Sequence, residues 1–149
     1  MSIHLKINKV LDEPTLPNIR PMVKKDVSKV KKVLKTHLDK MQIAFEFSKE
    51  EIEHYFLPRE GVMYTYVIES EDKKLIQDIF SFYSLPSTIL KPNKHSKINA
   101  CFSYYNTSLV HSPELVMENA IILAKKNGFD VLNCLDILEN EKTIEKNNF

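Results

Sequence analysis

The chain has 149 residues, the size of one domain, and its 43% hydrophobic and 28% charged content is ordinary for a soluble globular protein. Its formal net charge of +1 provides no overall electrostatic attraction for nucleic acid or for an anionic membrane. The chain has only two glycines, Gly61 and Gly128, whereas a Walker loop or a dinucleotide-binding fingerprint needs clustered glycines, so neither motif is present.

The first sixty residues predict one strand and two helices. Residues 3–7 alternate apolar and polar side chains, which predicts a short strand, and the prolines that follow predict an extended connector. Residues 24–41 place valines and leucines at helical spacing, so we expect an amphipathic helix packed on a flat surface. The lysines on its other face are more typical of a solvated face than of a binding patch. Residues 48–51 (SKEE) form a capping box that predicts a second helix, ending near Phe56.

Three strands are predicted next. Residues 62–70 and 75–84 are rich in β-forming side chains and flank a charged turn, which predicts an antiparallel hairpin. The Leu-Pro-Ser-Thr sequence at 85–88 cannot continue as a central strand, and residues 96–106 predict the third strand. We expect the strands on either side of this break to carry aromatic side chains on one face and hydroxyls on the other. Such a surface suits the floor of a groove for an extended peptide.

The remaining residues predict a buried helix followed by a strand. Ser112 is a good N-cap, Pro113 suits the first helical position, and residues 115–126 are apolar on nearly every side. Gly128 fits the position just after the end of this helix. Residues 129–133 predict a short buried strand, parallel to its neighbour through a right-handed crossover.

These elements predict a single domain over residues 1–149, of the mixed α/β or α+β class, with a central, mostly antiparallel sheet and helices on its faces. In such folds a ligand usually binds where neighbouring strands splay apart. Here this junction lies between the strand at 96–106 and the strand at 129–133. Residues 103–106 and Asn133 fall near it.

Several residues of this region are candidates for a binding site. Ser87 places its hydroxyl either in a groove or on its own backbone as a turn-stabilising serine, and the residues alone favour the turn. Asn133, at the end of an apolar strand, must find partners for its amide, so the binding and structural interpretations are evenly balanced. Four aromatic residues line a groove in one interpretation and form part of the core in the other, which is the more common arrangement. They are Tyr83, Phe102, Tyr104 and Tyr105.

No catalytic set is evident from the residues alone. Asp136 and Glu139 are a possible acid/base pair, but solvated or capping carboxylates are more typical of such a pair without a neighbouring His or Ser. A Ser-His-Asp set can be drawn from Ser87, His95 and Asp130, yet nothing in their spacing supports it.

Cysteine, histidine and hydropathy patterns limit the other possibilities. Cys101 and Cys134 lie in apolar, strand-like runs without a secretory leader before them, so we expect buried, reduced thiols and a cytoplasmic protein. No apolar run approaches the ~20 residues that span a bilayer, so we expect no stable membrane insertion. The histidines are scattered and no Cys-x-x-Cys pair occurs, so no metal site is predicted.

Several segments taken together resemble glycylpeptide N-tetradecanoyltransferase, the eukaryotic N-myristoyltransferase family. They come in the order of that family and are distributed over nearly the whole chain. The segments are residues 18–22 (NIRPM), 50–60 (EEIEHYFLPRE), 80–88 (FSFYSLPST), 103–106 (SYYN), 128–133 (GFDVLN) and 135–140 (LDILEN).

The resemblance implies a particular half of a larger enzyme. The family enzyme has two related halves, each with an acyl-CoA N-acyltransferase fold; the first binds myristoyl-CoA and supplies the oxyanion hole, and the second supplies most of the peptide groove. The chain resembles the second half. It therefore implies that this half binds no cofactor of its own and that myristoyl-CoA is the acyl donor of the whole enzyme. The implied partners are the N-terminal glycine peptides of substrate proteins and the missing N-terminal half.

The resemblance also implies the site residues. The groove serine of the family falls on Ser87, its groove tyrosines on Tyr83 and Phe102, and its substrate-facing asparagine on Asn133. Phe102 departs from the usual Tyr and so lacks a phenolic hydroxyl. The family's catalytic base is its terminal carboxylate, which lies beyond the segment matching Phe149, so no catalytic residue is implied within these residues.

We therefore expect these residues alone to be inactive as a transferase. The alternative is a non-catalytic module that holds glycine-initiated N-termini without acylating them. An independent acetyltransferase is disfavoured, because it would need a glycine-rich pyrophosphate loop of its own.

Overall fold

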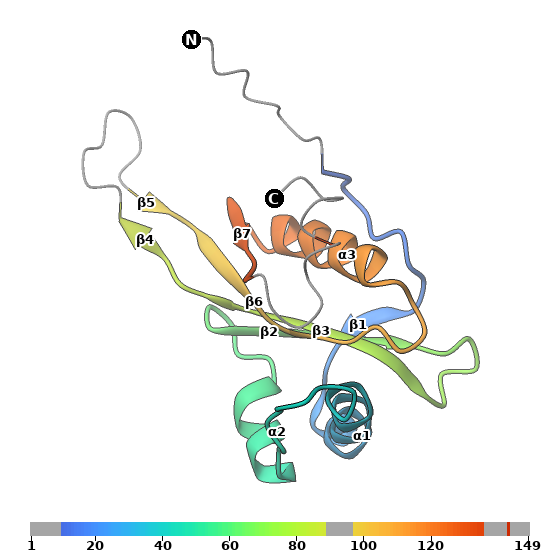
Figure 1. The fold of residues 1–149 in the computed structure, drawn as a ribbon. Helices are drawn as coiled ribbons and strands as arrows, with labels where there is room; N and C mark the ends of the chain where they lie inside the picture. Colours follow the sequence, from blue (N-terminus) through green and yellow to red (C-terminus); the bar gives the residue numbers. More distant parts are fainter. Residues whose placement is uncertain (1–9, 89–96, 136–142, 144–149) are drawn as a thin grey trace.

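The computed structural model describes residues 10–88, 97–135 and 143, which build a mixed β-sheet with helices on both faces (Figure 1). The strands of this sheet are β1 (Ile19–Pro21), β2 (Met63–Glu69), β3 (Ile76–Ser84), β6 (Ala100–Asn106) and β7 (Val131–Asn133). Their order is β1-β2-β3-β6-β7, with the first three pairings antiparallel and the last parallel. The predicted mostly antiparallel central sheet is confirmed.

Helices cover the two faces of the sheet. α1 (Val27–Leu38) and α2 (Lys49–Phe56) lie on one side, and α3 (Pro113–Lys126) lies on the other (Figure 1). Each side has its own hydrophobic cluster. The first gathers around Leu34, Ile52 and Phe56, and the second around Phe80, Phe82 and Met117. β3 lies at the centre and buries side chains toward both clusters.

The two helices on the first side begin as their sequences predict. A 3-10 turn at Lys24–Asp26 leads into α1, whose buried residues follow the expected apolar stripe; the helix ends at Leu38, earlier than the predicted limit of residue 41. In α2 the capping box is confirmed, because Ser48 Oγ accepts from the Glu51 N–H (3.1 Å) and the Glu51 carboxylate accepts from the Ser48 N–H (2.8 Å). The strand predicted at residues 3–7 lies outside the described residues.

The β2–β3 hairpin and the break after it are also confirmed. β3 ends at Ser84, and the chain continues into a separate two-stranded ribbon of β4 (Ser87–Thr88) and β5 (Lys97–Ile98). The prediction that aromatics occupy a single face is wrong. Phe82 packs in the cluster under α3, whereas the next residue, Tyr83, lies on the α1/α2 side, because consecutive side chains of a strand point to opposite faces.

A bulge in β6 explains how two consecutive aromatic residues share one side. Phe80 pairs with Asn106 and Phe82 with Ser103, so β6 contains one more residue than β3 between these pairs. An extra residue shifts the alternation of side chains. Tyr104 and Tyr105 consequently both pack against the α1/α2 cluster.

α3 and the segments around it follow the sequence closely. Ser112 Oγ accepts from the Leu115 N–H (3.3 Å), and Gly128 ends the helix with φ +81°. Asn119, fully buried in α3, accepts from the N–H groups of Thr15 (2.9 Å) and Leu16 (3.2 Å). The N-terminal segment is thereby fixed along α3, away from α1 and α2.

Candidate functional site

Three of the residues implied by the resemblance form one row across the sheet. Tyr83 of β3 pairs with Phe102 of β6, and Phe102 pairs with Asn133 of β7. Residues directly opposite on neighbouring strands project to the same face, so these side chains lie next to one another. The rings of Tyr83 and Phe102 are stacked, with centroids 5.7 Å apart and planes at 19°. We call Tyr83, Phe102 and Asn133 the sheet row.

The sheet row is supported by aromatic packing on the α1/α2 side. The Tyr104 ring meets Tyr83 edge-on at 6.1 Å, and the fully buried Phe56 of α2 lies 5.3 Å from Tyr104. Burial, and next the neighbouring Tyr105, raise the pKa of Tyr104. Its phenol therefore stays neutral at physiological pH and can donate a hydrogen bond. The arrangement places a half-buried aromatic shelf beside the parallel junction of β6 and β7.

Asn133 gives one end of the row a polar group. Its side chain is half-buried, and its hydrogen bond to the Cys101 carbonyl is long, at 3.5 Å from Nδ2. An amide has two donors and one acceptor, so most of its hydrogen-bonding capacity is available to a ligand. Cys101 itself is no nucleophile, because burial raises the pKa of its thiol to about 12.

Ser87 is not part of the row. It is exposed on the β4–β5 ribbon, opposite Ile98, and its Oγ donates to the Leu85 carbonyl (3.4 Å). This contact is the turn-stabilising one that the residues alone favour. A role for Ser87 in a groove stays a prediction that follows from the resemblance.

The other candidates for chemistry are accounted for or lie outside the described residues. The Asp130 carboxylate accepts from the Asn99 N–H (2.8 Å), which fixes the start of β7. His95, Asp136 and Glu139 lie outside the described residues. Within residues 10–88, 97–135 and 143, no group of three His, Cys, Asp or Glu side chains gathers that could hold a metal ion.

Asp78 is a buried polar residue that the sequence analysis missed. Its carboxylate is fully buried and accepts from the N–H groups of three consecutive residues, Leu109 (2.6 Å), Val110 (3.1 Å) and His111 (2.9 Å). The Thr107 hydroxyl (3.0 Å) and the His111 ring (2.9 Å) complete its partners. Asp78 thus fixes the connection from β6 to α3. A carboxylate between the apolar residues of a predicted central strand is the signal that could have revealed it.

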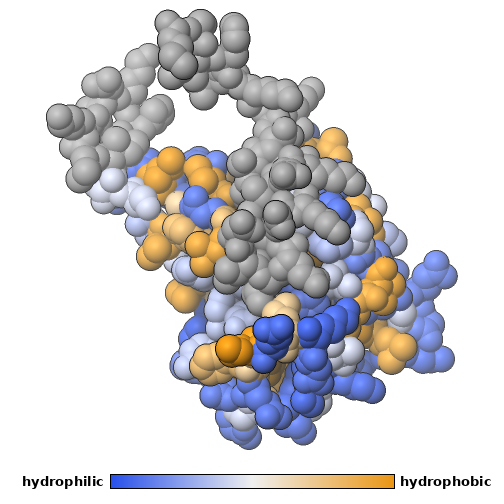
Figure 2. All heavy atoms as spheres, viewed as in Figure 1, coloured by the Kyte–Doolittle hydropathy of each residue, from blue (hydrophilic) through white to orange (hydrophobic). Residues whose placement is uncertain are grey.

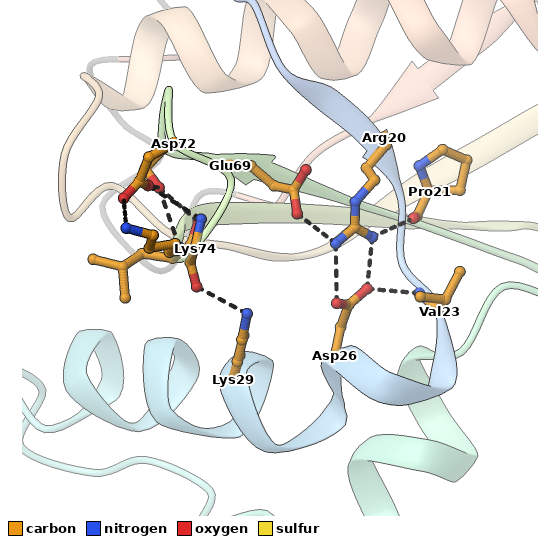
Figure 3. A network of polar contacts seen from close by, with 10 residues as sticks. Arg20, Pro21, Val23, Asp26, Lys29, Glu69, Asp72 and Lys74 are labelled. Atoms are coloured by element: carbon orange, nitrogen blue, oxygen red, sulfur yellow. Dashed lines mark hydrogen bonds and ion pairs between the residues drawn. The ribbon is translucent and has the colours of Figure 1, made fainter.

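Arg20 joins three elements on the α1/α2 side (Figure 3). Its guanidinium donates to Asp26 through both Nη atoms (2.6 and 3.0 Å) and to Glu69 (2.7 Å), linking β1, the 3-10 turn and β2. The hydrogen bond from Arg20 lowers the pKa of Glu69. Burial opposes ionisation of Asp26, but the bonds from Arg20 and from the Val23 N–H outweigh it and hold the pKa of Asp26 below its usual range. The role of Arg20 is therefore structural.

The chain matches known proteins over its whole length. The sequence model of the family described as "Myristoyl-CoA:protein N-myristoyltransferase, C-terminal domain" matches residues 1–149. Glycylpeptide N-tetradecanoyltransferase 1 of Arabidopsis thaliana is 38% identical over 149 residues, which is 100% of this chain and 34% of that protein. The Plasmodium falciparum enzyme is 41% identical over 140 residues, 94% of this chain and 34% of that protein.

A solved structure is similar in the same way. Saccharomyces cerevisiae N-myristoyltransferase with bound myristoyl-CoA superposes with a TM-score of 0.83 and 28% identity, covering 95% of this chain and 37% of that one. The expected acyl-CoA N-acyltransferase-like architecture, a mixed sheet with helices on its faces, is therefore confirmed. The chain spans about a third of the length of the curated relatives it matches.

Proposed function

Because the chain belongs to the family of the C-terminal domain of myristoyl-CoA:protein N-myristoyltransferases, we propose that it is the peptide-binding half of such an enzyme. The whole enzyme transfers a myristoyl group from myristoyl-CoA to the N-terminal glycine amine of proteins. The observation that carries the proposal is the sheet row, in which Tyr83, Phe102 and Asn133 meet at the junction of β6 and β7. Like the enzymes it resembles, the protein works in the cytoplasm.

The sheet row suits an extended peptide. The stacked rings of Tyr83 and Phe102 offer a flat apolar surface, and the Asn133 amide can pair with a peptide N–H or carbonyl. Because residue 102 is Phe, the phenol of Tyr83 is the polar group of this aromatic pair. Ser87, on the ribbon that extends from the end of β3, adds a hydroxyl along the same path.

The chemistry requires more than this surface. A glycine ammonium must lose a proton before its nitrogen attacks the thioester carbonyl, and the oxyanion that forms needs placed donors until the thiolate leaves. The groups of this half orient the amine and the peptide behind it. We propose that the base and the oxyanion donors come from the larger part of the enzyme, because the chain corresponds to about a third of its relatives.

Peptide binding to the 149-residue chain tests the proposal. We expect a glycine-initiated peptide to bind, and Asn133→Ala to weaken binding about tenfold, the effect of losing one or two hydrogen bonds of ordinary strength. Tyr66→Phe is a matched control, because Tyr66 lies on the α3 side and its hydroxyl accepts from Asn127 (2.8 Å). Equal affinities for wild type and Asn133→Ala would remove the sheet row from the proposed groove.

The short length relative to the relatives also leaves a second candidate function, a non-catalytic module that holds glycine-initiated N-termini. The coding sequence on either side discriminates between them. An upstream segment with a glycine-rich loop for coenzyme A identifies the enzyme, whereas stop and start signals directly at the two ends identify the module.

A further inference from the structure

The two most exposed large apolar side chains of the described residues lie in the loop between α1 and α2, residues 39–48. Ile43 is 93% exposed and Phe45 is 71% exposed. The loop is anchored by Phe47, which is buried edge-on between Phe56 (5.3 Å) and Tyr105 (5.4 Å). Apolar side chains that project from an anchored loop mark a surface that interacts with something other than water.

Two adjoining hollows open beside this loop. The first, about 410 Å³, is almost wholly apolar and is lined by Leu38, Met41, Ile43, Ala44, Phe45 and Tyr105. The second, about 270 Å³, shares four of these residues and is lined in addition by Lys31 and Lys35 of α1, together with Asp39 and Glu46. The apolar surface therefore passes directly into the lysine face of α1.

The charge of this part of the chain differs from the overall balance. Residues 24–49 contain eight lysines and three acidic residues, a formal charge of +5, whereas the whole chain carries +1. Two of the acids already have partners, since Asp26 binds Arg20 and Asp39 binds Lys35 (3.0 Å). Glu46 is the third acid. The hydrophilic surface gathers at the α1/α2 end of the molecule, with smaller apolar patches among it (Figure 2).

We propose that the loop and the lysine face of α1 dock on the surface of an anionic lipid bilayer. Ile43 and Phe45 enter the boundary between headgroups and acyl chains, and Lys31, Lys32 and Lys35 lie among the lipid phosphates. The argument for this occupant is charge complementarity, because a surplus of lysines beside projecting apolar side chains matches a surface that is anionic throughout and apolar beneath.

This docking is peripheral and does not depend on the proposed enzyme function. None of the described helices is long and apolar enough to cross a membrane. From sequence alone, the spacing of the lysines indicates a solvated face. The structure adds the neighbouring apolar loop, and the combination of the two indicates a lipid surface.

Vesicle flotation of the 149-residue chain tests the proposal. The chain should bind vesicles of phosphatidylcholine mixed with phosphatidylserine more tightly than vesicles of phosphatidylcholine alone, and added salt should weaken this binding. Ile43→Ser/Phe45→Ser should lower partitioning at least about tenfold. Lys31→Gln/Lys32→Gln should lower it about 30-fold, from roughly fivefold per lysine near an anionic surface.

A matched control removes the same charge elsewhere. Lys125→Gln/Lys126→Gln changes two exposed lysines of α3, on the opposite side of the sheet, and should leave partitioning unchanged. Thermal melts of every variant verify folding. The proposal is overturned by absence of vesicle binding, by equal losses in the two lysine pairs, or by retained binding in Ile43→Ser/Phe45→Ser. A shift from dimer to monomer in that variant, without loss of vesicle binding, would assign the surface to a second copy of the chain.

Discussion

Replacing Asp78 with Asn should destabilise the fold strongly while leaving its shape almost unchanged. The carboxylate is fully buried, and its two oxygens accept five hydrogen bonds. An amide of the same size has one oxygen and one nitrogen. If the nitrogen takes the place of Oδ2, the N–H groups of Val110 and His111 face a donor and lose their partner.

The magnitude follows from these two groups. A buried donor left without a partner costs about 1–3 kcal/mol, so the expected loss in the free energy of unfolding is about 2–6 kcal/mol. For a domain of this size each kcal/mol lowers the melting temperature by about 2–4 °C, which gives a decrease of about 4–24 °C. Urea and thermal unfolding measure both quantities.

Asp72→Asn is the matched control, because Asp72 lies on the exposed β2–β3 turn, where its carboxylate accepts from the Ser70 hydroxyl (2.6 Å). It should change the free energy of unfolding by less than about 1 kcal/mol. A loss of similar size in both variants would refute the argument that buried, unpartnered N–H groups set the cost.

The remaining predictions concern two structural positions. Arg20→Met should flatten the acid dependence of stability: the lowered pKa values of Asp26 and Glu69 give stability that is present above about pH 4 and lost as pH falls through the folded-state pKa values. Urea midpoints at neutral and acidic pH measure this effect, and an unchanged pH slope would contradict it. Gly128→Ala should cost about 1 kcal/mol, because φ is +81° there while a Cβ would meet nothing within 4 Å, so strain is the only penalty. A neutral effect in thermal melts would contradict this explanation.

Much of the fold could be predicted because its signals are local. The capping box at Ser48 and the N-cap at Ser112 depend on residues three positions apart, and both form the predicted hydrogen bonds. The β2–β3 hairpin depends on two neighbouring runs and a turn, and Gly128 on a single backbone conformation.

The site was less predictable because it depends on register between distant segments. Tyr83 and Phe102 meet Asn133 in one row only because β6 carries an extra residue opposite β3, and no local pattern announces that bulge. The same bulge, with the alternation of β3, made the single-face expectation for the aromatics wrong. Asp78 was missed since its partners lie 29 to 33 residues further along the chain.

Acyl transfer by a chimaera tests the central claim most directly. The chain replaces the matching C-terminal part of the Saccharomyces cerevisiae enzyme, and transfer from myristoyl-CoA to a glycine-initiated peptide is measured beside the 149-residue chain alone. We predict transfer by the chimaera, a clear decrease with Asn133→Ala, and negligible turnover by the chain alone. Turnover by the chain alone above a Ser87→Ala control would contradict the account, as would a folded chimaera that binds myristoyl-CoA but transfers nothing to the peptide.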